Sequence, residues 1–416
     1  MNFANLIHIA LRALSSNKMR CLLTMLGIII GVAAVIIILA LGNGLLCPWE
    51  AIALSTLVSE MFGSLPGLEW LRAVKLYTIL GADVYLFPTL IALGFAVYVI
   101  FLNFRGASSA AKLQAFLTKA LLCGMLLAMG VSLFTGSPDN AMPVFSQVTG
   151  AGGGKPATEG TSLFAGIVSV LVLTPFFYAG FDTIPQQAEE AAEGLNWNKF
   201  GKIISLALLA AGGFYMVCIY SFGTILDWHE FVKSPVPALA CLKGINMLLY
   251  LAMLVIATLG PMGPMNSFYG ATSRIMLAMG RKGQLPEKFA EVDPKSGAPK
   301  LACAVLGVIT VIGPFLGKNM LIPLTNVSAL AFIFSCGMVA LACLRMRFTE
   351  PDLPRPYEVP GGKFGISLAV AACAVIIGLL VVPFSPASLN MVEWSIVIGW
   401  LAVGLALMAF TNSRKK

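Results

Sequence analysis

Hydrophobic residues occur along this chain in long runs rather than in the periodic pattern of a half-buried helix or strand. A helix that crosses the hydrocarbon core of a bilayer needs roughly 20 apolar residues, and inside a membrane a helix satisfies its own backbone hydrogen bonds. The pattern therefore predicts an all-α, polytopic membrane protein with about eleven transmembrane helices. The expected spans are residues 22–46, 48–65, 86–104, 113–134, 163–184, 203–226, 245–279, 301–316, 322–344, 364–384 and 392–410.

The composition agrees with this pattern and narrows the class of protein. Hydrophobic residues make up 58% of the chain and charged residues 11%, with a mean hydropathy of +0.88, outside the usual range of soluble domains. The net charge is +8, but the basic residues lie in short segments between apolar runs, where membrane orientation explains them. We expect the lipid bilayer as a partner and no nucleic acid. No nucleophile and base pattern or phosphate loop indicates an enzyme.

The basic residues also predict an orientation. If the segment around Arg105 is cytoplasmic, alternation places the other basic clusters from residue 199 to the C-terminus mostly on the same side, as the positive-inside rule requires. This predicts a multi-pass protein of the cytoplasmic (inner) membrane with a cytoplasmic C-terminus. Arg12, Lys18 and Arg20 would hold the N-terminus on that side as well. Two cytoplasmic ends need an even number of crossings, so either residues 48–65 do not cross or one terminus is misoriented.

Metal chemistry has little support in the sequence. The 9 cysteines are scattered through the chain without a CxxC pair, so they are expected to be small buried hydrophobic residues. His8 and His229 are the two histidines and lie far apart in the sequence. We predict no metal site and no bound cofactor.

Four separated motifs carry a family resemblance. They are residues 103–107 (NFRGA) with 112–114 (KLQ); 176–185 (FFYAGFDTIP) with 188–190 (AEE); 271–279 (ATSRIMLAM) with Gly283, 285–286 (LP) and 298–299 (AP); and 353–362 (LPRPYEVPGG). From about residue 48 to the end, the chain resembles the amino acid/polyamine/organocation (APC) superfamily of secondary transporters. The resemblance implies a five-plus-five inverted-repeat fold and transport of an amino acid, by symport or antiport with a proton or sodium ion.

The second motif gives the candidate substrate site. Transporters with inverted repeats bind substrate where a helix is interrupted near the midplane, and Gly180 is the expected break. Asp182 is an acid inside a membrane span, which is functional by default. The candidate substrate-binding residues are Phe177, Tyr178, Ala179, Gly180, Phe181 and Asp182. In the alternative interpretation, Gly180 permits helix packing and Asp182 caps or pairs with a neighbour.

The long run at 245–279 gives the candidate ion-coupling site. Gly260-Pro261 and Gly263-Pro264 should kink this helix, because each proline removes a backbone donor. The polar residues that follow the kink are Asn266, Ser267 and Ser273. Their oxygens could ligate sodium or relay protons. The alternative is that they repair the backbone at the kink.

The first 46 residues carry a different resemblance. Residues 10–14 (ALRAL), 17–20 (NKMR), 23–34 (LTMLGIIIGVAA) and 41–44 (LGNG) resemble the N-terminus of ABC permease subunits of the macrolide-exporter and lipoprotein-release type. We therefore expect residues 1–46 to be an ABC-permease-like segment with one transmembrane helix. Residues 47–416 are expected to be a permease domain without its first two helices, so the inverted-repeat fold would be incomplete.

Three functional hypotheses follow. The leading one is a secondary active amino acid transporter, impaired if the missing helices are essential. The main alternative is a non-transporting membrane protein or truncated fusion product, and an ABC-type permease component is third. The sequence names neither the amino acid nor the oligomeric state.

Overall fold

The computed structural model describes residues 42–65, 67–142, 163–183, 196–231, 236–353, 355 and 357–413. The run at 22–46 and the segment 1–46 therefore lie outside the described residues, except for 42–46. A first helix spans Gly42–Ser64. The α-helices after it are α3 (Leu86–Phe104), α4 (Ala107–Thr135), α5 (Leu163–Tyr178), α7 (Trp197–Gly223), α8 (Trp228–Phe231), α9 (Pro237–Ile245), α10 (Met247–Leu259), α11 (Met262–Arg281), α12 (Lys300–Ile312), α13 (Leu321–Thr349), α14 (Gly362–Val381) and α15 (Met391–Ser413).

The polytopic helical architecture is confirmed. Among the described residues, 7 helices are long and apolar enough to cross a membrane: Gly42–Ser64, Leu86–Phe104, Ala110–Thr135, Asn198–Gly223, Met247–Arg281, Lys318–Thr349 and Gly362–Val381. Three shorter apolar helices are Leu163–Tyr178, Lys300–Phe315 and Met391–Leu407. Each run expected from residue 86 onward corresponds to one of these helices.

One boundary between the expected spans was wrong. The expected runs end at residue 46 and begin again at Pro48, but the Gly42–Ser64 helix continues through both positions. The neighbours of Pro48, namely Leu46, Cys47 and Ala51, are buried, and this packing offsets the missing backbone donor of Pro48. Gly313 lets the chain after α12 approach the Gly42–Ser64 helix closely, because a Cβ atom at Gly313 would lie 2.6 Å from the Pro48 carbonyl oxygen. The boundary at 46/47 thus falls inside a continuous helix.

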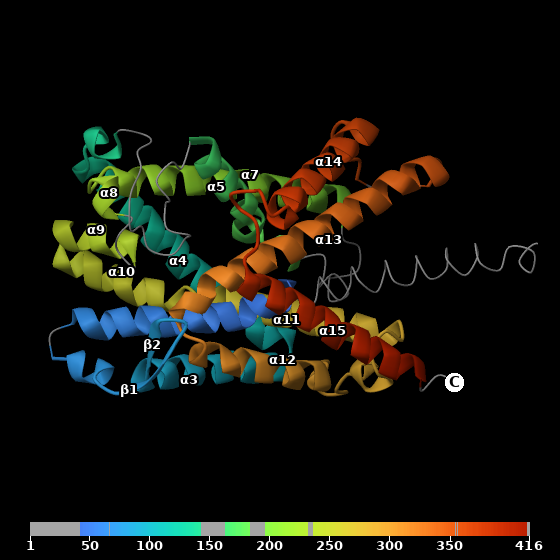
Figure 1. Cartoon of the computed structure of the whole chain (residues 1–416), viewed down its shortest axis with the longest axis horizontal. Coiled ribbons are helices and arrows are strands. Elements are labelled where there is room, and N and C mark those ends of the chain that lie inside the picture. The colour runs from blue at the N-terminus through green and yellow to red at the C-terminus, as the bar shows by residue number, and fades with distance from the viewer. Residues whose placement is uncertain are drawn as a thin grey trace, which may run out of the picture.

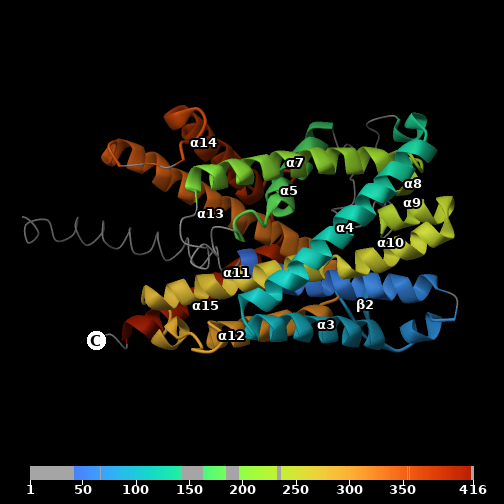
Figure 2. The ribbon, with the colours of Figure 1, turned by 180° about the vertical axis from the view of Figure 1, so that it is seen from behind.

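The Gly42–Ser64 helix is the most deeply buried of the seven long helices. Figure 1 shows it running through the middle of the bundle, with α13 crossing over it. Helix α13 packs against α5, α14 and α15, while α11 packs against α3, α4 and α12. Seen from behind (Figure 2), α4 runs diagonally between α11 and the peripheral helix α7.

A β-hairpin lies at one end of the bundle and was not predicted. Strands β1 (Lys75–Ile79) and β2 (Ala82–Tyr85) pair antiparallel. Leu80 and Gly81 connect them with φ angles of 49° and 76°, as in the primed turns that match hairpin twist. In Figure 1 the hairpin lies at one end of the bundle. The C-terminus and the basic segment after α11 both lie at the other end (Figure 1).

Candidate functional site

Helix α5 is interrupted where the sequence predicts a break. It ends at Tyr178, and residues 179–182 form turns. Gly180 has a φ angle of 124°, which glycine adopts readily and other residues do not. A Cβ atom at this position would meet no atom of the described residues within 4 Å. Position 180 therefore requires glycine because of its backbone φ angle and not because a larger side chain would clash with a neighbour.

Asp182 ties the break to the centre of the bundle. Its Oδ1 accepts a hydrogen bond from the Gly180 backbone N–H at 3.0 Å, and its Oδ2 accepts one from Asn43 Nδ2 at 3.0 Å. Asn43 is 1% exposed and belongs to the Gly42–Ser64 helix. The carboxylate thus faces protein, as expected for an acid inside a membrane span.

The backbone groups at the break have internal partners in this conformation. Tyr215 donates its hydroxyl to the Phe177 carbonyl oxygen at 2.9 Å. Thr183 donates both its hydroxyl, at 2.6 Å, and its backbone N–H, at 3.1 Å, to the Gly180 carbonyl oxygen. Side chains and one turn therefore replace the helical bonds that end at Tyr178. The Phe177 carbonyl oxygen keeps a second lone pair that can accept from a ligand, whereas the Gly180 carbonyl oxygen already accepts two hydrogen bonds.

The aromatic side chains of the predicted site pack against two neighbouring helices. Phe177 is 50% exposed, and its ring lies edge-on to Tyr215 of α7, with ring centroids 6.3 Å apart. Phe181 packs edge-on against Phe332 of α13, with ring centroids 5.8 Å apart. Tyr178 packs against Tyr215 of α7 at 6.1 Å. The structure therefore places the six predicted residues around one break, with the Phe177 and Tyr178 rings against Tyr215 and the Phe181 ring against α13.

The predicted kink between α10 and α11 is present, but its polar residues do not form one site. Helix α10 ends at Leu259 and α11 begins at Met262, so the interruption falls at Gly260-Pro261. Asn266 and Ser273 are separated by seven residues, about 10 Å along a helix, so one ion cannot contact both. Ser273 donates to the Gly270 carbonyl oxygen at 2.8 Å and accepts from Arg274 at 3.0 Å. Ser267 is half-buried on the same helix.

Asn266 is the centre of a buried amide network. Its Oδ1 accepts from Asn103 Nδ2 at 2.9 Å. Its Nδ2 donates to the Ala110 carbonyl oxygen at 3.0 Å and to Gln114 Oε1 at 3.3 Å. These contacts join α11 to α3 and α4, and they engage both the oxygen and the nitrogen of the Asn266 amide in packing between helices. The side chain of Asn266 thus bonds to α3 and α4 rather than to backbone groups at the kink, and an ion-coupling role for it stays a prediction.

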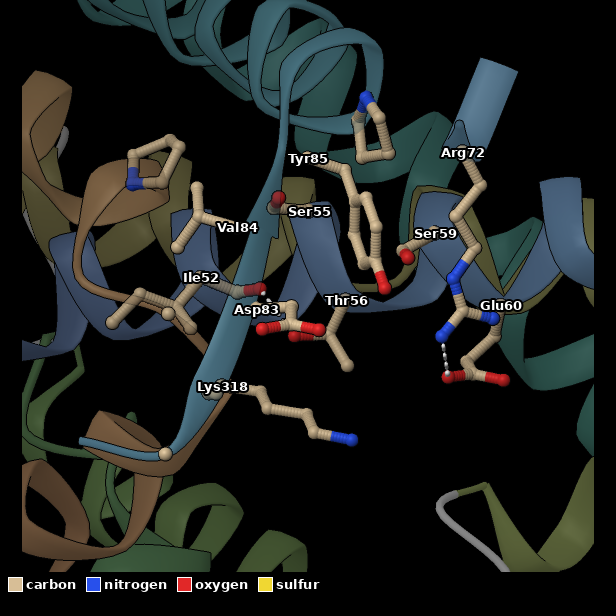
Figure 3. Close-up of a pocket in the computed structure, with 15 residues that line it drawn as sticks. Ile52, Ser55, Thr56, Ser59, Glu60, Arg72, Asp83, Val84, Tyr85 and Lys318 are labelled. Carbon is tan, nitrogen blue, oxygen red and sulfur yellow. Dashed lines mark hydrogen bonds and ion pairs between the residues drawn. The ribbon is translucent and has the colours of Figure 1, made fainter. Parts of the chain in front are cut away.

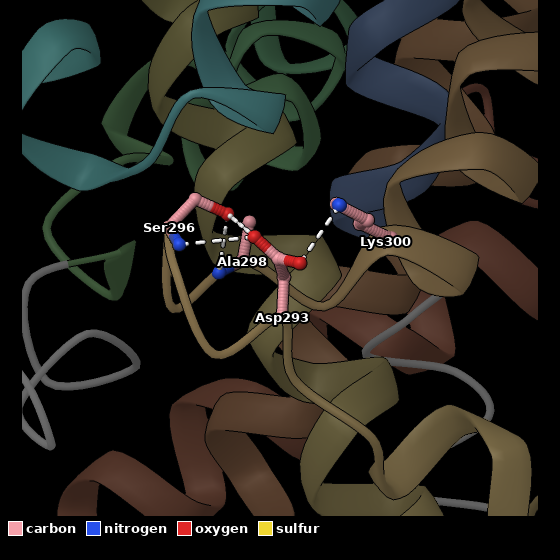
Figure 4. Close-up of polar contacts among 4 residues, drawn as sticks. All are labelled: Asp293, Ser296, Ala298 and Lys300. Carbon is pink, nitrogen blue, oxygen red and sulfur yellow. Dashed lines mark hydrogen bonds and ion pairs between the residues drawn. The ribbon is translucent and has the colours of Figure 1, made fainter.

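A second polar cluster closes the loop after α11 (Figure 4). Asp293 accepts hydrogen bonds from the Ser296 hydroxyl at 2.8 Å and backbone N–H at 3.0 Å, and it pairs with Lys300 at 2.8 Å. Lys300, followed by the Ser296 contacts, lowers the pKa of Asp293 to about 2. The loop packs on Gly106, where a Cβ atom would lie 2.7 Å from the Ser296 carbonyl oxygen. The first and third sequence motifs therefore meet here as a structural contact.

One residue of the site was not identified from the sequence. Asn43 lies 139 residues from its partner Asp182. Its local signal, a polar residue between Gly42 and Gly44 in an apolar run, had been assigned to the ABC-permease-like segment. Only the three-dimensional packing connects it with the break in α5.

Comparison with known proteins identifies the family. A model of the amino acid permease family matches residues 21–407. The branched-chain amino acid permease BcaP of Bacillus subtilis (strain 168) is 27% identical over 257 residues, 61% of this chain and 51% of that protein. The cystine/glutamate transporter of Homo sapiens is 26% identical over 272 residues, 65% of this chain and 51% of that transporter. The aspartate-proton symporter of Bacillus subtilis (strain 168) is 30% identical over 131 residues, 30% of this chain and 24% of the symporter.

The chain spans about half the length of the first two relatives. The family match begins inside the 1–46 segment, whose resemblance to ABC permease subunits stays a prediction. The broken α5, the kinked α10 and α11, and a family match over most of the sequence agree with one another. This chain belongs to the amino acid permease family.

Proposed function

We propose that this chain is a secondary active transporter of amino acids that binds its substrate at the break in α5. The observation that carries the proposal is the glycine-centred interruption with an acid beside it, in a member of a permease family. Interrupted helices in transporters offer backbone groups to the charged ends of a ligand. The substrate's ammonium group would donate to Asp182 and to the carbonyl oxygen of Phe177, which are both acceptors.

Binding at this place would alter the internal contacts of the break. The substrate's carboxylate would compete with Asp182 for the Gly180 backbone N–H, which Asp182 now accepts at 3.0 Å. Release of Asp182 would also loosen its bond to Asn43. Substrate binding would thereby be linked to the packing of α5 against the Gly42–Ser64 helix, which gives the protein a physical means of coupling occupancy to conformation.

The remaining features of the proposal concern placement and energy supply. The cytoplasmic (inner) membrane, with the C-terminus on the cytoplasmic side, is supported by the concentration of basic residues in one set of loops. A proton or a sodium ion is the proposed coupling ion. Ser267 and Asn266 remain candidate residues for it, while Ser273 lies beside the guanidinium group of Arg274, where like charge disfavours a cation.

Equilibrium binding tests the proposed site. Radiolabelled amino acids are titrated against the purified chain, against Asp182→Asn, and against Asp139→Asn, which changes an exposed acid on the 3-10 helix Pro138–Ala141. A lost charge-assisted hydrogen bond is worth about 1.5–3 kcal/mol, so Asp182→Asn should weaken binding about tenfold or more. Equal affinity for Asp182→Asn and Asp139→Asn would contradict a substrate role for Asp182.

A further inference from the structure

A polar pocket of about 170 Å³ lies at the hairpin end of the bundle, on a different set of elements from the break in α5. Its walls are the Gly42–Ser64 helix, the β1–β2 hairpin and the connection between α12 and α13 (Figure 3). The volume is enough for several water molecules or one small organic molecule. Nothing in the proposed transport site uses its residues.

The pocket is held in shape by contacts between the hairpin and the α12–α13 connection. Tyr77 donates its hydroxyl to the Phe315 carbonyl oxygen at 2.6 Å, and Asn319 Nδ2 donates to the Leu80 carbonyl oxygen at 2.8 Å. Gly317 has a φ angle of 72°, and a Cβ atom there would lie 2.9 Å from Ile79 Cγ2. The hairpin is therefore seated directly on the connection, which fixes Asp83 of β2 and Lys318 relative to each other.

The pocket contains one acid that stays ionised and has unused acceptor capacity. The Oδ1 oxygen of Asp83 forms an ion pair with Lys75 Nζ at 2.6 Å and accepts a hydrogen bond from the Thr78 hydroxyl at 2.8 Å. Lys75, Thr78 and Tyr85 lower the pKa of Asp83. Neither the Lys75 contact nor the Thr78 contact uses its Oδ2 oxygen. This oxygen can accept from a ligand's ammonium group.

The pocket also contains a cation without an ion pair among the described residues. Lys318 is exposed, and Figure 3 shows its amine extended past Asp83 and Thr56 into the open part of the pocket. Farther along the wall, Arg72 and Glu60 approach to 4.0 Å. The lining residues of the pocket thus include two acids, Asp83 and Glu60, and two cations, Lys318 and Arg72. A ligand with a single charge therefore meets repulsion as well as attraction.

Hydroxyl groups line the helical wall between these charges. Ser55, Thr56 and Ser59 project from one face of the Gly42–Ser64 helix, as the spacing of four residues allows. The Thr56 hydroxyl donates to the Ile52 carbonyl oxygen at 2.9 Å, so its lone pairs face outward as acceptors. A ligand with both donors and acceptors can use this wall.

We propose that this pocket binds a small zwitterion of the α-amino acid class, with its ammonium group on Asp83 Oδ2 and its carboxylate on Lys318 Nζ. The inference rests on the proposed function only for the choice of ligand class, since the pocket itself is separate from the break in α5. The charges are accessible to solvent, so the affinity is expected to be weak, about millimolar. The pocket would hold substrate at the hairpin end of the bundle without taking part in the translocation step.

Binding of radiolabelled L-alanine to the purified full chain tests this proposal. The measurement is made on Asp182→Asn, so that the break in α5 does not contribute, and then with Lys318→Gln or Asp83→Asn added. Each addition should weaken binding about tenfold or more, because a charge-assisted contact is lost. Lys282→Gln, an exposed lysine at the opposite end, is the matched control and should leave binding unchanged.

Ligand analogues give a second test that does not depend on folding of the variants. L-alaninamide lacks the carboxylate and propionate lacks the ammonium group, so each should compete with L-alanine at least tenfold less well than unlabelled L-alanine. Equal competition by either analogue, unchanged binding in Lys318→Gln and Asp83→Asn, or no L-alanine binding to Asp182→Asn would overturn the proposal. Uptake by wild type that Asp182→Asn abolishes would uphold the transport site in each of those cases, so the two proposals fail separately.

Discussion

Replacing Gly180 by alanine isolates the conformational demand of the break in α5. The φ angle of 124° lies where non-glycine residues are strained, at a cost of about 1–3 kcal/mol. The added methyl group meets no atom within 4 Å in the part of the chain that the structure describes, so no steric clash there contributes. Gly180→Ala should therefore lower the free energy of unfolding by about 1–3 kcal/mol and weaken amino acid binding at the break.

Gly130→Ala is the matched control, because it adds the same methyl group in open space within helix α4. In a helix interior, alanine is favoured over glycine by about 0.5–1 kcal/mol, so the two variants should differ by roughly 1.5–4 kcal/mol. Equilibrium unfolding in mixed detergent micelles measures both values. Equal stabilities for the two variants would refute the claim that the break requires a positive φ angle.

Three further changes test other parts of the account. Asn266→Ala removes the centre of the buried amide network and leaves buried partners unsatisfied, so the free energy of unfolding should fall by about 2–4 kcal/mol. One unsatisfied buried group costs at least about 1 kcal/mol, so a smaller loss would argue against a structural role for Asn266. Gly280→Ala places a Cβ atom 2.6 Å from the Ala290 backbone nitrogen, and overpacking of this kind should cost about 3 kcal/mol in thermal unfolding assays, whereas wild-type stability would contradict the packing described. Asp293→Asn should accelerate tryptic cleavage after Lys295, because the Asp293 carboxylate stabilises this loop, and cleavage at the wild-type rate would show that the carboxylate does not. The pKa of Asp293 is depressed, so its stabilisation of the loop is complete above about pH 4 and is lost as the pH falls toward about 2.

The helices from residue 86 onward could be predicted because each depends on a local property, an apolar run of sufficient length. The boundary between the runs at 22–46 and 48–65 was wrong because the sequence does not show the burial that surrounds Pro48 in one continuous helix. The hairpin was missed because its strands, Lys75–Ile79 and Ala82–Tyr85, are short, and most of the first is exposed. Hydrophobic alternation over so few residues is a weak signal.

The break at Gly180 was predicted from a glycine and an acid within one apolar run, and the structure contains it. The partners of that break could not be predicted, since Asn43 and Tyr215 come from other helices and reach it only after the bundle packs. The same limit applies to Asn266, whose partners lie 163 and 152 residues away. Local patterns show which residues are unusual, and long-range contacts decide what those residues do.

Uptake into proteoliposomes tests the central claim most directly. Radiolabelled amino acids are supplied outside vesicles that carry an inward proton or sodium gradient, and wild type is compared with Asp182→Asn and Asp139→Asn. The account predicts gradient-dependent uptake by wild type and by Asp139→Asn, with a loss of about tenfold or more in Asp182→Asn. Uptake that is equal in all three proteins, or absent from correctly folded wild type, would contradict transport through the break in α5.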